Sequence, residues 1–231
     1  MDEPKTYSPE GFNCVNITED MTYDKNLFLM PDEDYEELEN ILIPEGLIKS
    51  RIDKLAQQIY KQYRSNKTNP LQIFVIMNGA FQFFSDLQSS IKKVREFSGE
   101  RIEYDTHFLK IKGYVGTESK LCGIEESVLP ESMIRGYDIL IVEDIYDSGT
   151  LMSQLLGHIT QYDPRSVKTA VLIHKCNPLN LKHNFKADFT GFTVPGYSFC
   201  VGYGMDYNEH FRDISHVCSV SKEGIEKYKG F

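Results

Sequence analysis

The chain has 231 residues, 41% of them hydrophobic and 26% charged, which is typical of one globular domain of ordinary size. Its 25 basic and 34 acidic residues leave a net charge of −9, which argues against nucleic acid or an anionic membrane as the main partner. Five cysteines without a Cys-x-x-Cys spacing favour reduced thiols over disulfides or a zinc site. No apolar run is long enough to span a membrane, and the first residues resemble no signal peptide, so we expect a cytoplasmic protein.

The first quarter of the chain changes from polar to strongly periodic. Residues 1–22 are polar and predict a mobile arm, and the acidic stretch that follows predicts a short helix near Asp32–Asn40. From Leu47 to Tyr63, apolar residues recur at a spacing of 3.6 residues, which predicts an amphipathic helix.

The middle of the chain alternates strands and helices. Leu71–Met77 reads as a buried strand, a second helix runs through Phe83 and Val94, and Ile102–Ile111 reads as another strand. A stretch of about 20 residues rich in Gly, Pro and charge follows, and such long irregular segments are often functional lids.

The second half continues the alternation. Asp138–Val142 is the strongest buried-strand signal, a helix carries Leu151 to Ile159, and Val167–Ile173 is a further strand. Short strands separated by Gly and Pro are expected between Phe185 and Cys218. This order predicts an α/β fold with a parallel sheet covered on both faces.

An acidic turn follows the strongest strand. Glu143 and Asp144 come directly after it, Asp147 follows three residues later, and Ser148-Gly149-Thr150 lead into a helix. Ligands of open parallel sheets bind at the carboxyl ends of strands, and free N–H groups at a helix start attract phosphate. The carboxylates would bind sugar hydroxyls or Mg²⁺, and a third would move a proton. The structural alternative is an acidic turn in which Asp147 or Ser148 only caps the helix.

The sequence LIVEDIYDSG at this turn closely resembles the phosphoribosyl-pyrophosphate signature of type I phosphoribosyltransferases. Other segments resemble the hypoxanthine-guanine phosphoribosyltransferase family, namely NLFLMP, LIPEGLIKSRIDKLA, FFSDL, KADFTGFTVP and VGYGMDYNEHFRD. The resemblance runs from about Tyr23 to Lys229. It implies the type I phosphoribosyltransferase fold in one domain, residues 23–231: a central, mostly parallel sheet flanked by helices. It also implies a small hood lobe from about residues 23–46 and 185–231, and a flexible lid over about 112–132.

The resemblance implies a purine salvage enzyme. Such an enzyme transfers 5-phosphoribosyl from phosphoribosyl pyrophosphate to hypoxanthine or guanine, which gives IMP or GMP plus pyrophosphate, with Mg²⁺ as cofactor. It also implies a homodimer or homotetramer.

The resemblance further assigns roles at the acidic turn. Asp147 would be the catalytic acid/base near N7 of the purine, and Glu143 and Asp144 would hold the ribose hydroxyls directly or through Mg²⁺. The loop after them would hold the 5′-phosphate. The complete set implied to bind the phosphoribosyl group is Glu143, Asp144, Ile145, Tyr146, Asp147, Ser148, Gly149, Thr150 and Leu151.

Other implied roles lie elsewhere in the chain. Lys175 would donate to the 6-oxo group of the purine, Phe199 would stack on its face, and Asp206 would bind a second Mg²⁺. The residues implied to bind the purine are Lys175, Ser198, Phe199, Cys200 and Asp206. The residues implied for pyrophosphate are Asn78, Gly79 and Arg212, and those implied to open the lid are Gly113 and Tyr114.

Each of these assignments has a structural alternative. Lys175 could be a surface lysine, Phe199 could be an ordinary core residue, and Asp206 and Arg212 could be a surface ion pair. A dinucleotide-binding oxidoreductase is disfavoured because no Gly-x-Gly-x-x-Gly follows the first strand.

The chain departs from the family pattern around the phosphates. Asn78 stands where the family usually has lysine, Thr150 and Leu151 stand where it usually has Lys-Thr, and Gly113 replaces a serine. These changes predict an active enzyme with a weakened hold on the sugar donor. The alternative function is a diverged paralogue that binds nucleotide or partner subunits with little turnover.

Overall fold

A parallel sheet forms the centre of the computed structural model, which describes residues 13–31, 36–65, 68–111, 129–177, 180 and 185–229. Within these ranges the sheet has six strands in the order β1-β7-β6-β5-β3-β4, and each neighbouring pair is parallel. The strands are β1 (Val15–Asn16), β3 (Leu71–Met77), β4 (Tyr104–Lys110), β5 (Asp138–Tyr146), β6 (Ser166–Cys176) and β7 (Phe189–Pro195). The predicted fold class is therefore confirmed.

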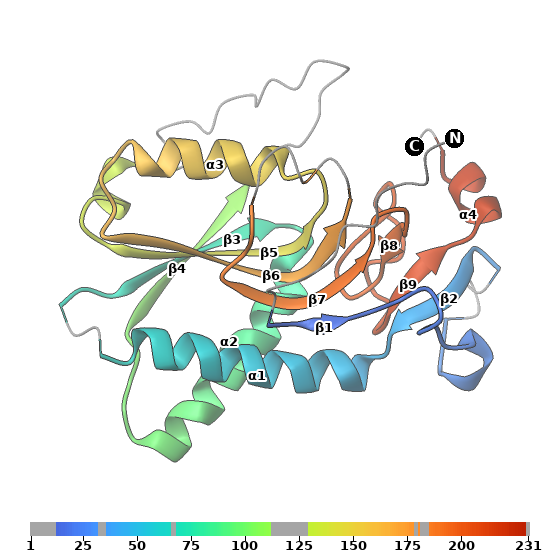
Figure 1. The fold of residues 1–231 in the computed structure, drawn as a ribbon, viewed down its shortest axis with the longest axis horizontal. Coiled ribbons are helices and arrows are strands. Elements are labelled where there is room, and N and C mark those ends of the chain that lie inside the picture. The colour runs from blue at the N-terminus through green and yellow to red at the C-terminus, as the bar shows by residue number, and fades with distance from the viewer. Residues whose placement is uncertain are drawn as a thin grey trace.

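Helices cover both faces of this sheet (Figure 1). Helices α1 (Glu45–Tyr63) and α2 (Ala80–Ser98) lie on one face and α3 (Thr150–Thr160) lies on the other. The apolar stripe of α1 is buried against the sheet, and its members include Ile48, Ile52, Leu55 and Ile59. Because α1 and α2 pack on the same face, they place polar side chains from both helices close together.

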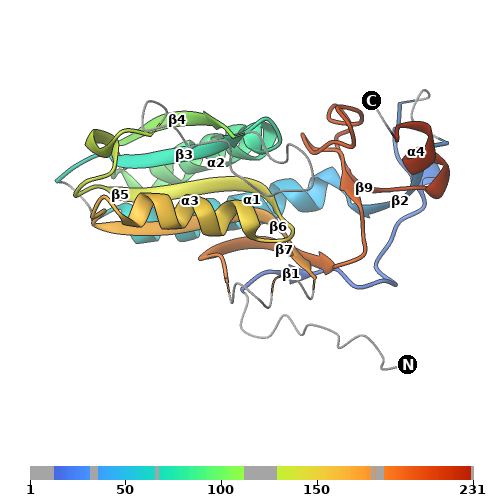
Figure 2. The ribbon, with the colours of Figure 1, turned by 90° about the horizontal axis from the view of Figure 1, so that it is seen from above.

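A second, antiparallel sheet lies beside the main one (Figure 2). Its order is β2-β9-β8, so it joins the N-terminal part of the chain to the C-terminal part. The elements here are η1 (Lys25–Leu27), β2 (Leu38–Ile43), β8 (Cys200–Val201), β9 (Val217–Val220) and α4 (Lys222–Lys227). We call this part the hood. The strand β7 lies within the range predicted for the hood lobe but pairs with β6 in the main sheet.

Two predictions for the N-terminal part are wrong. The helix expected near Asp32–Asn40 is not formed in its described part, where a turn at residues 36–37 leads into β2. Pairing of Leu38 with Val220 and of Ile41 with Cys218 buries this segment, so tertiary contacts outweigh the local preference for helix.

The end of the expected mobile arm is also ordered. Val15 and Asn16 pair with β7, and the Ile17 amide donates to the Thr193 carbonyl at 2.8 Å. The buried Arg51 side chain of α1 donates to the carbonyls of Thr190 and Gly191 in β7, so this edge of the main sheet is tied to α1.

Asp138 at the start of β5 gives a testable acid dependence of stability. Burial raises the pKa of Asp138, but hydrogen bonds from Arg165 and Ser166 outweigh burial and lower it overall. A carboxylate with a lowered folded pKa stabilises the protein above its unfolded pKa of about 3.9 and loses this effect as pH falls through the folded value. We expect Asp138→Asn to lower the free energy of unfolding by about 1.5–3 kcal/mol at neutral pH.

Urea unfolding near neutrality and near pH ~3 checks this expectation, because the difference from the unmodified protein should shrink in acid. Asp163→Asn is the control, since the Asp163 side chain is 88% exposed and lies 3.9 Å from Arg135 in a weak ion pair. An equal loss of unfolding free energy at both pH values would contradict a lowered pKa of Asp138 in the folded protein.

Candidate active site

The acidic pair Glu143 and Asp144 belongs to β5, which extends four residues beyond its predicted end at Val142. Pairing with β6 continues to Tyr146 opposite His174, so both carboxylates are fixed on a strand near its carboxyl end. Burial, and then the charge of Asp144, raises the pKa of Glu143 well above its usual value. Burial also raises the pKa of Asp144 to about 6, with Arg212 lowering it and Asp206 raising it. Asp206 and Arg212 therefore lie within electrostatic reach of the strand end.

The turn after β5 requires glycine at one position. Gly149 is the N-cap of α3 with φ +77°, and a Cβ there would lie 2.0 Å from the Tyr146 hydroxyl. The Ser148 hydroxyl lies 3.3 Å from that of Thr150. Gly149 has no side chain to cap the helix, but the Thr150 amide donates to the Ser148 hydroxyl at 3.5 Å, so Ser148 has part of the capping role of the structural alternative. The start of α3 thus presents backbone N–H groups in the way that anion sites use.

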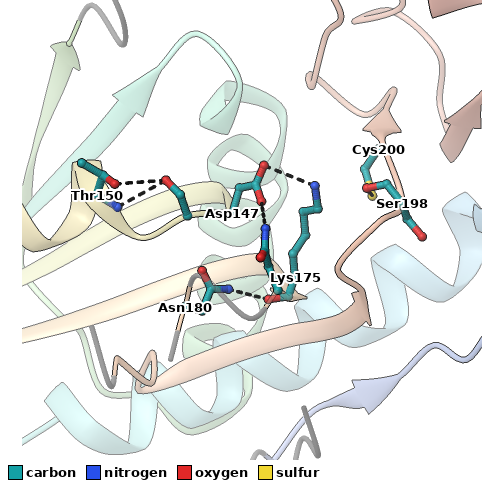
Figure 3. A network of polar contacts seen from close by, with 8 residues as sticks. Asp147, Thr150, Lys175, Asn180, Ser198 and Cys200 are labelled. Atoms are coloured by element: carbon teal, nitrogen blue, oxygen red, sulfur yellow. Dashed lines mark hydrogen bonds and ion pairs between the residues drawn. The ribbon is translucent and has the colours of Figure 1, made fainter. Parts of the chain in front are cut away.

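Asp147 and Lys175 face one another at the carboxyl ends of β5 and β6 (Figure 3). The Lys175 Nζ donates to Asp147 Oδ2 at 3.2 Å, and Asn177 Nδ2 donates to Oδ1 at 3.4 Å. Lys175 is only 7% exposed, whereas the Asp147 side chain is 52% exposed. Asn180 Nδ2 donates to the Lys175 carbonyl at 2.5 Å and holds the backbone there. Lys175 is therefore not a surface lysine.

Ser198 and Phe199 lead into β8 of the hood, which begins at Cys200. Figure 3 shows Ser198 and Cys200 across from the Lys175 amine. Burial raises the pKa of the Cys200 thiol to about 12, with Lys175 lowering it and Asp147 raising it, so the thiol stays protonated near neutral pH. Phe199 is 41% exposed and meets the Tyr207 ring edge to face at 4.9 Å. Phe199 is therefore not an ordinary core residue.

Asp206 and Arg212 form an ion pair at 2.9 Å in the hood segment that follows β8. Both side chains are mostly buried, and Arg212 also donates to the Gly204 carbonyl at 2.9 Å. Asp206 and Arg212 do form the ion pair that the structural alternative expects. The pair is not an isolated surface contact, because both charges affect the pKa of Asp144.

The loop at Asn78–Gly79 packs against the end of β5 and against the hood segment at Gly204. A Cβ on Gly79 would lie 1.8 Å from Asp144 Oδ2, and a Cβ on Gly204 would lie 2.6 Å from the Gly79 carbonyl oxygen. Glycine at 79 and 204 therefore lets three segments meet: the end of β5, the start of α2 and the hood segment near Asp206. The peptide bond between Met77 and Asn78 is cis.

The other residues predicted to bind the phosphoribosyl group, Ile145, Tyr146 and Leu151, pack their side chains against hydrophobic clusters. Tyr146 is buried and stacks on His174 and Phe185, while Ile145 and Leu151 pack against opposite hydrophobic clusters. Of these side chains, that of Tyr146 also reaches the turn, since its hydroxyl lies against Gly149. Gly113 and Tyr114 lie outside the described residues, and so does most of the predicted lid.

Sequence reasoning missed Asn177 and Asn180, which hold Asp147 and the Lys175 backbone. Their only sequence signal is their position just after the β6 strand. Gly204 was missed as well, although a glycine two residues before the predicted metal ligand Asp206 is a usable signal.

The predicted Mg²⁺ ligands do not form a closed cage. No group of three His, Cys, Asp or Glu side chains within the described ranges converges on one point that could hold a metal. The prediction that Asp206 binds a second Mg²⁺, apart from Glu143 and Asp144, does not need such a group and stays a prediction. The residues still fit Mg²⁺, because this ion commonly takes one or two carboxylates and completes its shell with water and substrate phosphate. Burial raises the pKa of Asp144, and a cation bound beside it would favour the charged carboxylate.

A parallel sheet with carboxylates and a glycine turn at its carboxyl edge is typical of nucleotide-binding α/β proteins. Residues 39–208 match the family described as Phosphoribosyl transferase domain. The chain is 38% identical over 211 residues to the hypoxanthine-guanine phosphoribosyltransferases of Homo sapiens and Pan troglodytes, which covers 90% of this chain and 92% of theirs. The crystal structure of hypoxanthine-guanine phosphoribosyltransferase from Schistosoma mansoni in complex with IMP is similar, with a TM-score of 0.78 and 28% identity over 93% of this chain and 98% of that one.

The chain therefore belongs to the phosphoribosyltransferase family and, within it, to the hypoxanthine-guanine phosphoribosyltransferases. Within the described ranges, no helix is long and apolar enough to cross a bilayer.

Proposed function

We propose that this protein transfers the 5-phosphoribosyl group of phosphoribosyl pyrophosphate to N9 of hypoxanthine or guanine, giving IMP or GMP and pyrophosphate in purine salvage. The names of the relatives and the IMP complex of the Schistosoma mansoni enzyme support the substrates. The observation that carries the proposal is the pair of Asp147 and buried Lys175 beside the Gly149 turn. This arrangement presents a proton acceptor, a donor and an anion site on one edge of the sheet.

Asp147 and Lys175 would divide the purine chemistry. The Asp147 carboxylate is held by Lys175 and Asn177 yet remains half exposed, so it can share the N7 proton of a bound base. Removing that proton raises the electron density of the ring and favours attack through N9. The Lys175 ammonium would donate to the 6-oxo group, which adenine lacks.

The hood would hold the base from its other side. The exposed Phe199 ring would stack on the purine, and its edge-to-face contact with Tyr207 keeps it in place. Ser198 and the backbone of Cys200 would meet the purine edge, and Asp206 would lie near its 2-position.

The turn from Asp147 to Leu151 would hold the 5′-phosphate. The backbone N–H groups at the start of α3 and the hydroxyls of Ser148 and Thr150 would supply the donors. Leu151 is apolar and partly buried, so it contributes only its backbone, whereas a threonine at this position would add a hydroxyl.

Glu143 and Asp144 would bind the ribose hydroxyls directly or through Mg²⁺, and Asp206 would hold a second Mg²⁺. Bound Mg²⁺ neutralises charge on the pyrophosphate oxygens and so makes pyrophosphate a better leaving group. Arg212 would add its positive charge there, and the Asn78–Gly79 loop would donate hydrogen bonds to the same group. The lid that begins at Gly113 and Tyr114 would exclude water, which would otherwise hydrolyse the donor.

The cytoplasm and a homodimer or homotetramer also belong to this proposal. The described cysteines Cys14, Cys176, Cys200 and Cys218 are free thiols, which agrees with a reducing compartment. Exposed Phe81 and Phe108 offer apolar surface that a second copy would cover.

The alternative, a nucleotide-binding paralogue with little turnover, is not favoured by the relatives, which are named as enzymes. The deciding experiment measures product formation from radiolabelled hypoxanthine, guanine, xanthine and adenine with phosphoribosyl pyrophosphate and Mg²⁺. Turnover of the first two bases supports the enzyme. Binding of GMP without turnover of any base would favour the alternative.

The departures in the phosphate loops predict a donor KM above that of relatives with the usual residues. Asn78 is exposed, so a lysine fits there without disturbing the core. We expect Asn78→Lys and Leu151→Thr each to lower the donor KM by about two- to tenfold, the effect of one added hydrogen bond. Steady-state kinetics at saturating hypoxanthine measure this change.

Ser89→Lys is the matched control, because it adds the same charge at an exposed position of α2 beyond the loop. If Asn78→Lys and Ser89→Lys lower the donor KM equally, the cause is the change in net charge and not the position of the lysine.

A further inference from the structure

Asp86 collects polar contacts from three elements. It lies on α2, about two helical turns after the Asn78–Gly79 loop. Its Oδ2 accepts from Lys49 Nζ of α1 at 2.6 Å, from Gln82 Nε2 of α2 at 3.3 Å and from the Tyr203 hydroxyl of the hood. The Asp86 side chain is 20% exposed and that of Lys49 is 42% exposed, so Asp86 is shielded from water more than its lysine partner is.

Tyr203 brings the hood segment onto α2. It is buried, its φ of +53° is in the left-handed region, and its amide donates to the Ile214 carbonyl at 2.6 Å. A non-glycine residue keeps this backbone conformation only where its surroundings hold it. The Lys49 ammonium lies 5.8 Å from the Tyr203 ring centroid and adds a second contact to the same side chain.

The residue after Tyr203 touches the pyrophosphate loop. The Gly204 amide donates to the Arg212 carbonyl at 2.9 Å, and a Cβ at Gly204 would lie 2.6 Å from the Gly79 carbonyl oxygen. The segment that carries Asp206 and Arg212 is therefore seated directly against Gly79.

The contact between Asp86 and Tyr203 joins two parts of the donor site. One end of it is fixed to α2, which begins at the Asn78–Gly79 loop, and the other is fixed to the hood segment with Asp206 and Arg212. We propose that Asp86 and Tyr203 are positioning residues that set the pyrophosphate loop and the Asp206–Arg212 segment at the spacing that phosphoribosyl pyrophosphate requires. The role of the spacing rests on the proposed function, whereas the contact itself does not.

The protonation states of Asp86 and Tyr203 favour the hydrogen bond between them near neutral pH. Burial raises the pKa of the Tyr203 hydroxyl, and its hydrogen bond to Asp86 and the charge of Asp86 raise it further, so it remains a donor. Burial raises the pKa of Asp86, but the hydrogen bonds from Lys49 and Tyr203 outweigh it and the carboxylate stays ionised near neutral pH.

Tyr203→Phe tests the proposal, because it removes the hydroxyl and keeps the buried ring. We expect the KM for phosphoribosyl pyrophosphate to rise about three- to tenfold, while kcat and the KM for hypoxanthine change less than about twofold. Asp86→Asn should act in the same direction, and the double variant should be no worse than the stronger single one.

The matched control lies one helical turn further along the same two helices. Ser90 donates to Asp53 at 2.6 Å between α2 and α1, in the way that Lys49 and Asp86 are joined, and this hydrogen bond involves no residue of the hood. Ser90→Ala should leave the donor KM unchanged. An equal rise in the donor KM for Ser90→Ala, or equal rises in both substrate KM values for Tyr203→Phe, would overturn the proposal.

Amide hydrogen exchange gives a reading that does not depend on activity. Tyr203→Phe should speed exchange in the peptide that covers residues 202–214 without affecting β6, and Ser90→Ala should not. Unchanged exchange there would overturn the proposal. If the unmodified protein forms no IMP or GMP, the proposed function fails, and the exchange result still decides whether the contact holds the two segments together.

Discussion

Asp147→Asn is expected to lower kcat for IMP and GMP formation by about 10²- to 10⁴-fold, the usual range for loss of a general acid/base. Asparagine keeps the shape of the side chain and can still accept a hydrogen bond from Lys175, but it cannot take up a proton. The geometry of the pair at 3.2 Å should therefore survive while the proton transfer is lost. Single-turnover product formation measures the chemical step.

Binding of the product separates chemistry from recognition in this variant. We expect the Kd for IMP to change by less than about tenfold, because the 5′-phosphate turn keeps its backbone donors. Asp163→Asn is the control, since it removes an exposed carboxylate from the turn between α3 and β6. A kcat within about threefold of the unmodified protein would remove Asp147 from the acid/base role.

The sequence was most informative where local pattern and tertiary packing agree. Leu71–Met77 was predicted with the bounds that the structure gives, because a strand buried on both faces needs an uninterrupted apolar run. The helix from Leu47 to Tyr63 was also predicted, since its stripe faces the sheet over its whole length. In both elements the local pattern and the final contacts favour the same structure.

The N-terminal strand could not be predicted from its own residues. Leu38 pairs with Val220, 182 positions further along the chain, and nothing in the acidic stretch around Leu38 identifies that partner. The same holds for Val15, which pairs with Phe192 at the edge of the main sheet. Local preference is decisive only when no distant strand competes for the segment.

For the candidate site, the sequence indicated residue types but not their supports. Asp147 and Lys175 were predicted in separate roles, and the structure joins them in one ion pair. The asparagines that hold this pair, and the Tyr203 hydroxyl on Asp86, follow from the approach of loops that the sequence does not relate to each other.

Lys175→Met should affect the choice of base most strongly. Methionine keeps the long apolar stem in a site where Lys175 is almost fully buried, but it removes the ammonium that would donate to the 6-oxo group. A hydrogen bond from a charged donor contributes about 1.5–3 kcal/mol, so kcat/KM for hypoxanthine and guanine should fall about 10- to 150-fold. The KM for phosphoribosyl pyrophosphate should stay nearly constant, because the role proposed for Lys175 is with the purine and not with the pyrophosphate.

Lys168→Met on the same strand is the control for this change. Lys168 pairs with Asp188 at 2.9 Å near the opposite end of β6, so the control also breaks an ion pair on the strand but should leave kcat/KM unaltered. The decisive quantity is the ratio of kcat/KM for hypoxanthine to that for adenine, measured in both variants. Loss of the ammonium should reduce this ratio only at Lys175, since only a donor aimed at the base can distinguish a 6-oxo from a 6-amino group. A ratio unchanged in Lys175→Met would mean that base selection depends on the hood instead, and that Lys175 serves only to hold Asp147.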